Sequence, residues 1–166
     1  LGAADPALAP PDGTYRRVQE ICERHDIMFV ADEVMCGLGR AGAPLGLDHW
    51  GVVPDVVVLG KGLAAGYAPL GGIAVREDVY EPVATGSGAF RHGFTYSGHP
   101  VSAAVGERVL RILSEEDLVR RSAEKGATLV SGLRRLKEDA PVIHEVRGLG
   151  LLVGVVLGSP ATGDPS

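Results

Sequence analysis

The spacing of apolar residues predicts helices that alternate with short strands. Between residues 15 and 25 apolar side chains recur three and four positions apart, which predicts an amphipathic helix. Residues 27–31 form an unbroken apolar run rich in strand-forming residues, and residues 56–59 repeat it. Such runs are typical of strands buried on both faces of a parallel sheet. Residues 73–75 are a candidate third strand, so the pattern favours an α/β fold.

The second half of the chain predicts two helices and a smaller pair of strands. Pro100 suits the first turn of a helix, and the sequence Ser-Glu-Glu-Asp from Ser114 matches a capping box for a long helix that reaches about residue 138. Gly126 and Gly132 interrupt that helix, each at a cost of about 1 kcal/mol. We expect strands at residues 142–146 and 151–157, and loops at residues 1–13, 85–99 and 158–166, where turn-forming residues gather.

Polar groups follow two of the predicted strands directly. Asp32 and Glu33 come after the first strand, and Gly60-Lys61-Gly62 comes after the second. In open α/β sheets, ligands bind outside the carboxyl ends of the strands, so Asp32 and Lys61 are candidate site residues. Neighbouring residues of an extended chain point to opposite faces. We therefore expect one of the two carboxylates to face the site, and the other to be buried with a partner or solvated.

Composition and charge exclude several classes of protein. The chain has 166 residues, long enough for one ordinary domain, and a formal net charge of −5, which argues against a general binder of nucleic acid or of a membrane surface. Its two cysteines lack the spacing of a zinc site or a disulfide framework, and His92 and His99 have no matched third ligand, so no metal is expected. No uncharged stretch reaches the length of a membrane span. We expect a cytoplasmic protein.

Lys61 is the most unusual residue of the chain. No other charged residue lies between Asp55 and Arg76. An amine in an apolar pocket is a good nucleophile for a Schiff base, whereas a lysine on a surface loop simply extends into solvent. With a Schiff-base lysine some thirty residues further on, Asp32 has a chemical use, because an aspartate can keep the pyridine nitrogen of pyridoxal phosphate protonated.

Two loops carry further candidate motifs. Residues 91–100 combine hydroxyl groups and glycines just before a predicted helix, which fits a phosphate cradle or an ordinary capped loop equally well. Residues 37–42 match the Gly-x-Gly-x-x-Gly pattern of dinucleotide-binding proteins. That pattern must open a helix directly after a strand, and here residues 32–36 intervene and Pro44 follows, so we reject a dinucleotide site.

These motifs together resemble a known family. Residues 31–42, residues 51–55, Lys61-Gly62 and residues 95–100 closely resemble the class III pyridoxal-phosphate-dependent aminotransferases, with Met35 as in omega-transaminase-like members. The resemblance implies a fold-type-I chain with a mostly parallel sheet and helices on both faces. Residues 1–115 would be the C-terminal part of the large cofactor-binding domain, and residues 116–166 the linking helix and the start of the small domain.

The resemblance also implies residue roles. Lys61 would be the Schiff-base lysine and proton shuttle, and Asp32 would pair with the pyridinium nitrogen. Val34 would pack against the cofactor ring, and Thr95 would contact a phosphate, typically that of the partner subunit in a homodimer. The expected reaction transfers an amino group from an amino acid or amine to a 2-oxo acid.

Departures from the family pattern limit these expectations. Met35 and Ala41 replace the usual glutamine and threonine, which leaves the amino donor and acceptor open. Family members are much longer, so the chain resembles an internal or C-terminal fragment that we expect to be inactive alone. Two alternatives stay open: another fold-type-I pyridoxal enzyme, such as an aminomutase or decarboxylase, and a remnant that only dimerises or binds.

Overall fold

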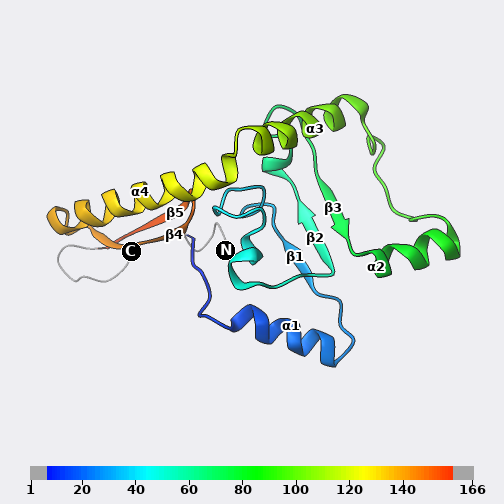
Figure 1. The fold of residues 1–166 in the computed structure, drawn as a ribbon, viewed down its shortest axis with the longest axis horizontal. Coiled ribbons are helices and arrows are strands. Elements are labelled where there is room, and N and C mark those ends of the chain that lie inside the picture. Colours follow the sequence, from blue (N-terminus) through cyan, green and yellow to red (C-terminus); the bar gives the residue numbers. More distant parts are fainter. Residues whose placement is uncertain (1–6, 159–166) are drawn as a thin grey trace.

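The protein has an α/β architecture with two small sheets (Figure 1). The computed structural model describes residues 7–158; the ends of the loops predicted for residues 1–13 and 158–166 lie outside this range. The elements in chain order are α1 (Thr14–Arg24), β1 (Val30–Asp32), the 3-10 helix η1 (Gly46–Trp50), β2 (Val56–Leu59), the 3-10 helix η2 (Lys61–Leu63), β3 (Gly72–Val75), α2 (Glu77–Pro82), the π-helix η3 (Val83–Ser87), α3 (Pro100–Glu115), α4 (Leu118–Asp139), β4 (Ile143–Leu149) and β5 (Leu152–Leu157). The predicted α/β class is confirmed.

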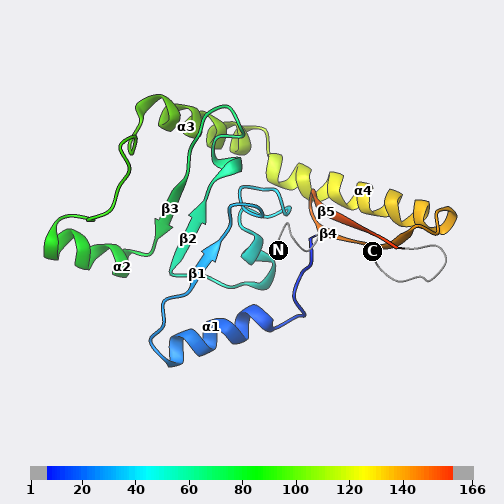
Figure 2. The same cartoon turned by 180° about the vertical axis from the view of Figure 1, so that it is seen from behind.

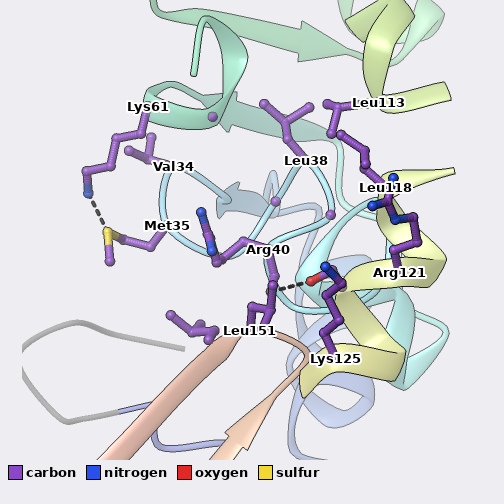
Figure 3. A pocket seen from close by; sticks show the side chains of 15 residues that line it. Val34, Met35, Leu38, Arg40, Lys61, Leu113, Leu118, Arg121, Lys125 and Leu151 are labelled. Carbon is purple, nitrogen blue, oxygen red and sulfur yellow. Dashed lines mark hydrogen bonds between the residues drawn. The ribbon is translucent and has the colours of Figure 1, made fainter. Parts of the chain in front are cut away.

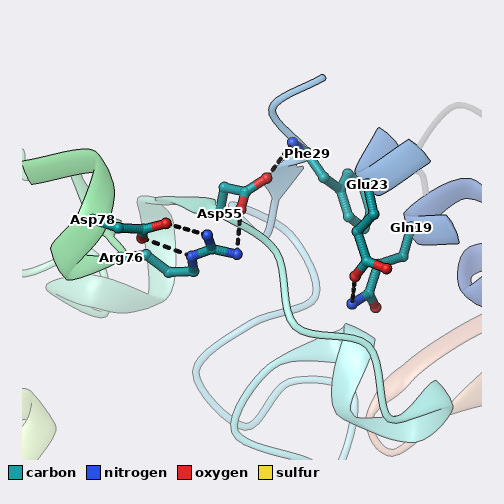
Figure 4. A network of polar contacts seen from close by, with 6 residues as sticks. All are labelled: Gln19, Glu23, Phe29, Asp55, Arg76 and Asp78. Carbon is teal, nitrogen blue, oxygen red and sulfur yellow. Dashed lines mark hydrogen bonds and ion pairs between the residues drawn. The ribbon is translucent and has the colours of Figure 1, made fainter. Parts of the chain in front are cut away.

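The larger sheet brings the two predicted site strands together. β1 pairs in parallel with β2, and β2 pairs antiparallel with β3. β1 is shorter than the predicted strand because the backbone N–H of Phe29 donates to Asp55 Oδ2 at 2.6 Å, not to a neighbouring strand. Asp55 also forms an ion pair with Arg76 (Figure 4). Arg76 in turn donates a hydrogen bond to Asp78, which lowers the pKa of the Asp78 carboxyl. This polar network closes the amino end of β1 and β2.

Only one side of β1 is covered. Ala31 is buried in a small core with Leu47 and Val52, against which Tyr15 of α1 and Trp50 of η1 pack edge to face, with ring centroids 5.0 Å apart. Val30, in contrast, is 51% exposed. The prediction that this strand is buried on both faces is therefore wrong within residues 7–158, where no helix covers its second face.

Two predictions of where helices begin and end differ from the structure. α3 begins at Pro100 as predicted, and the His99 ring nitrogen Nδ1 accepts the N–H of Ser102 at 3.3 Å as a cap. The predicted capping box is wrong: Ser114 lies inside α3, and α4 follows Asp117, whose φ is 50°. Part of the predicted loop 85–99 is helical, since η3 reaches Ser87. None of the helices within residues 7–158 has the length and apolar character to cross a membrane.

Three glycines allow the C-terminal hairpin to pack closely against the rest of the chain. The β4–β5 hairpin lies along α4 in both views (Figures 1 and 2). A Cβ atom on Gly126 would lie 2.0 Å from the carbonyl oxygen of Gly150, and one on Gly150 would lie 2.3 Å from the backbone nitrogen of Gly42. We call this contact of Gly42, Gly126 and Gly150 the glycine junction. It explains why α4 carries a glycine where alanine is the better helix former.

Candidate active site

Asp32 and Lys61 lie at the same edge of the larger sheet. Asp32 is the last residue of β1 and stands opposite Val58 of β2, and Lys61 begins η2 two residues after β2 ends. Because β1 and β2 are parallel, both carboxyl ends meet at this edge. The Asp32 side chain is exposed, and its Oδ1 accepts the N–H of Val34 at 3.0 Å, which turns the chain away from the strand.

The backbone at Lys61 is strained. Its φ is 38°, in a left-handed region that residues other than glycine rarely adopt, at a cost of about 1 kcal/mol or more. Its side chain is exposed and its ammonium group donates to the sulfur of Met35 (Figure 3). The isolated charge in the sequence therefore corresponds to a lysine that lines an open cavity, not to one enclosed by apolar side chains.

Val34 packs against the turn that presents Lys61. A Cβ atom on Gly60 would lie 3.4 Å from a methyl carbon of Val34, which is ordinary van der Waals contact. Val34 and Lys61 line the same cavity. The two segments after β1 and β2 are thus in contact beside the lysine.

Glu33 is a structural carboxylate. It is 3% exposed, and its two oxygens accept the backbone N–H groups of Gly46 and Leu47 at 2.8 and 2.9 Å. Asp32 is exposed, so the prediction that the two carboxylates separate, one buried with a partner, is confirmed. Burial and, after it, a hydrogen bond with Glu33 raise the pKa of the Cys36 thiol to about 12. The buried carboxylate of this segment therefore anchors the loop that contains Gly46 and Leu47.

The cavity beside Lys61 has a volume of about 560 Å³. Figure 3 shows its lining residues, which come from the turns after β1 and β2, the end of α3, the start of α4 and the turn of the hairpin. Asp32 instead lines a smaller cavity of about 130 Å³ on the core side. Thr95 lies in an exposed turn before α3 and lines neither cavity. The structure thus brings Val34 and Lys61 to one cavity and leaves Asp32 and Thr95 outside its lining.

Three cationic residues of this cavity were missed in the sequence. Arg40, Arg121 and Lys125 line it together with Lys61. Arg121 and Lys125 are four positions apart on α4, so they share a helix face, but the sequence does not show which face meets the sheet. Within residues 7–158, no cluster of three His, Cys, Asp or Glu side chains could hold a metal ion.

The comparisons with known proteins agree with one another. The aminotransferase class-III family model matches residues 7–164. An uncharacterized aminotransferase of Bacillus subtilis (strain 168) is 47% identical over 155 residues, which cover 93% of this chain and 35% of that protein. The crystal structure of a transaminase from the marine bacterium Virgibacillus has a TM-score of 0.88 and 43% identity, covering 95% of this chain and 36% of that one.

A third relative is an amine transaminase from an uncultivated Pseudomonas species, solved in a PLP-bound form. It has a TM-score of 0.87 and 41% identity, and the match covers 95% of this chain and 36% of that one. The chain therefore spans about a third of the length of the relatives it matches.

Proposed function

The chain belongs to the class-III aminotransferase family, and from this membership we propose that it forms part of a pyridoxal-phosphate-dependent transaminase in which Lys61 holds the cofactor. The whole enzyme would move an amino group from an amino acid or amine to a 2-oxo acid. The observation that carries the proposal is the strained Lys61 backbone at the carboxyl end of β2, beside the carboxyl end of β1. Strain of this kind persists where the surrounding structure imposes it, and it gathers at functional sites.

The residues at this edge fit the chemistry of pyridoxal phosphate. The cofactor needs a primary amine for its aldehyde, a carboxylate for its pyridine nitrogen and an apolar surface for its ring. Lys61, Asp32 and Val34 supply these three groups from two adjacent segments, and Lys61 and Asp32 are both exposed and accessible. When bound, the cofactor supplies an electron sink for the carbanion formed at the substrate α-carbon.

The roles of the chain's own groups follow from their chemistry. The Asp32 carboxylate keeps a proton on the pyridine nitrogen, because an opposite charge nearby favours the protonated form. Lys61 would hold the cofactor through its amine, and the same amine would serve as the base that accepts and returns the proton at the substrate α-carbon. Val34 holds the ring in place by packing.

We extend the proposal to the assembly and the domains. Thr95 lies in an exposed turn outside the Lys61 cavity, which supports a role at the cofactor phosphate of a second copy in a homodimer. α3 ends at Glu115 and α4 starts at Leu118, which supports a division into a large-domain part up to residue 115 and a small-domain part from residue 116.

The proposal is tested by trapping the cofactor on the chain. We expect that incubation with pyridoxal phosphate, followed by borohydride reduction and peptide mass spectrometry, labels Lys61 in preference to Lys125 and Lys137. These are the only other lysines, and Lys137, which does not line the cavity, serves as the internal control. Lys61→Arg should abolish the preferred label, and Asp32→Asn should lower its yield.

Labels spread evenly over the three lysines would overturn the assignment of Lys61. Circular dichroism of each variant ensures that a lost label reflects the missing amine and not an unfolded chain.

A further inference from the structure

A methionine sulfur lies against the amine of Lys61. Met35 and Lys61 line the same cavity from the turns after β1 and β2, and the Lys61 ammonium group donates to the Met35 sulfur (Figure 3). Among residues 7–158, this sulfur is the single hydrogen-bond partner of the ammonium group, and no Asp or Glu of that range lines the cavity. The chemical state of one sulfur atom therefore bears directly on the amine.

The backbone around the two residues keeps this contact in place. Val34, which precedes Met35, lies beside the turn of Lys61, since a Cβ atom on Gly60 would be 3.4 Å from a methyl carbon of Val34. The φ of 38° at Lys61 persists only where the surrounding structure imposes it, so the side chain leaves the backbone in a fixed direction. Met35 is partly exposed and lines a cavity of about 560 Å³, which admits a small molecule.

Oxidation would change the sulfur from a weak hydrogen-bond acceptor into the carrier of a strong one, the sulfoxide oxygen. In the reaction with hydrogen peroxide, the sulfur lone pair attacks one peroxide oxygen, the O–O bond breaks and an S–O bond forms. The hydroxide that leaves takes the proton from the transferred oxygen and departs as water, so sulfur loses the two electrons that the peroxide gains. The new oxygen accepts a hydrogen bond from the Lys61 ammonium group, which favours the charged form of the amine, and the charged form is not a nucleophile.

We propose that Met35 is an oxidation site through which a peroxide slows the reaction of the Lys61 amine with an aldehyde. As a control over a transaminase, this inference rests on the proposed role of Lys61. The effect of the sulfoxide oxygen on the amine depends only on the contact between Met35 and Lys61. Dedicated reductases return methionine sulfoxide to the thioether, so the modification is reversible.

Competitive acetylation of the full chain tests the inference without the cofactor. A trace of acetic anhydride labels each lysine at a rate that follows its fraction of uncharged amine, and peptide mass spectrometry measures both these labels and the oxygen added to each methionine. We expect hydrogen peroxide to lower the acetylation rate of Lys61 relative to Lys137 about tenfold, the effect of one new charge-assisted hydrogen bond. Lys137 lies on α4 outside the cavity and is the internal reference.

The only other methionine of the chain provides the matched control. Met28 is 54% exposed and does not line the cavity, so Met28→Leu should leave the peroxide effect intact, whereas Met35→Leu should remove it. Met35→Gln places an amide oxygen on a side chain of similar length. This variant should slow the acetylation of Lys61 without peroxide and make it insensitive to peroxide. Circular dichroism checks that each variant is folded.

Two results would overturn the inference. One is an unchanged rate at Lys61 in chains whose Met35 carries the added oxygen, and the other is an equal fall in Met35→Leu, which would assign the effect to another oxidised group. Cofactor labelling of the untreated chain separates the two proposals. If the acetylation rate does not respond to peroxide while Lys61 takes the pyridoxal label, only the present inference falls. If the rate responds while the labels scatter over the three lysines, only the role of Lys61 falls.

Discussion

At the scale of single residues, the two carboxylates that follow β1 have different tasks. Asp32 is exposed at the sheet edge, and Glu33 is buried, with both oxygens on backbone N–H groups. The separation was predictable from the alternation of an extended chain. The partners of Glu33 were not, because Gly46 and Leu47 are more than ten residues away and carry no sequence signal for this contact.

Replacing Glu33 with glutamine tests the anchoring role. Glutamine keeps the shape but turns an amide N–H toward one of the two backbone donors, so we expect the free energy of unfolding to fall by about 2 kcal/mol. Urea denaturation measures the loss. Glu20→Gln, which removes an exposed partner of Arg17, is the matched control and should change stability by less than about 0.5 kcal/mol. Equal losses in the two variants would contradict the role of Glu33.

Cys36 predicts a dependence of stability on alkaline pH. Its folded pKa is raised from 9.0 to about 12, so above pH 9 the unfolded chain releases a proton that the folded chain retains. Stability from the buried thiol is fully present below pH 9 and falls as the pH rises towards 12, by at most about 1.4 kcal/mol per pH unit. Urea denaturation between about pH 8 and 10 measures this slope.

Cys36→Ala should flatten the slope, whereas Cys22→Ala should leave it in place. The range is chosen below the ordinary pKa of tyrosine, since burial, and after it the charges of Cys36 and Glu33, also raise the pKa of Tyr15. A slope that persists unchanged in Cys36→Ala would show that another group causes it.

At the scale of elements, local sequence patterns predicted helices and strands correctly, whereas the sequence did not show the contacts between distant segments. The helix at Thr14–Arg24 follows from the period of its apolar residues, and the strand at Val56–Leu59 follows from its unbroken apolar run. The capping box failed because α3 continues through Ser114. Gly126 and Gly132 look alike in the sequence, as two weak points of one helix, yet only Gly126 faces a backbone.

The two glycines of α4 should therefore respond in opposite directions to alanine. Gly132 has no atom within 4 Å of its missing Cβ, so Gly132→Ala should raise the free energy of unfolding by about 0.5–1 kcal/mol. Gly126→Ala forces a Cβ against the carbonyl of Gly150 and should lower it by at least about 2 kcal/mol. Thermal unfolding of both variants measures the difference. The same sign of change in both would refute the glycine junction.

At the scale of the whole molecule, the larger sheet leaves much apolar surface uncovered. Exposed side chains on and around it include Ile27, Met28, Val30, Val53 and Ile73. Exposed apolar side chains on a sheet favour association with another surface. The sequence predicted residues 27–31 as a strand buried on both faces, because an apolar run indicates a tendency to be covered and does not show whether the covering layer is present.

We expect the isolated chain to bind a hydrophobic dye and to associate as its concentration rises. Ile73→Lys, at an exposed position of β3, should reduce both effects. Leu129→Lys, at an exposed position of α4 away from the sheet, is the control and should reduce neither. Dye fluorescence and sedimentation velocity measure the two effects. A chain that stays monomeric and does not bind the dye would contradict the prediction that this surface associates.

The contacts beside the glycine junction also have a consequence for the order of folding. The carbonyl of Arg40 accepts hydrogen bonds from the N–H of Leu151 at 3.0 Å and from the hydroxyl of Ser122 at 3.3 Å. Ser122 lies 82 positions after Arg40 in the sequence. Joining such remote segments requires closure of a long loop, whose entropic cost must be met before the contact contributes anything. The sheet and α4 can each form beforehand from nearer contacts. We therefore expect the cavity between them to be among the last features to be assembled. A chain halted earlier would contain Lys61 and Arg40 but would lack the approach of Arg121 and Lys125 from α4.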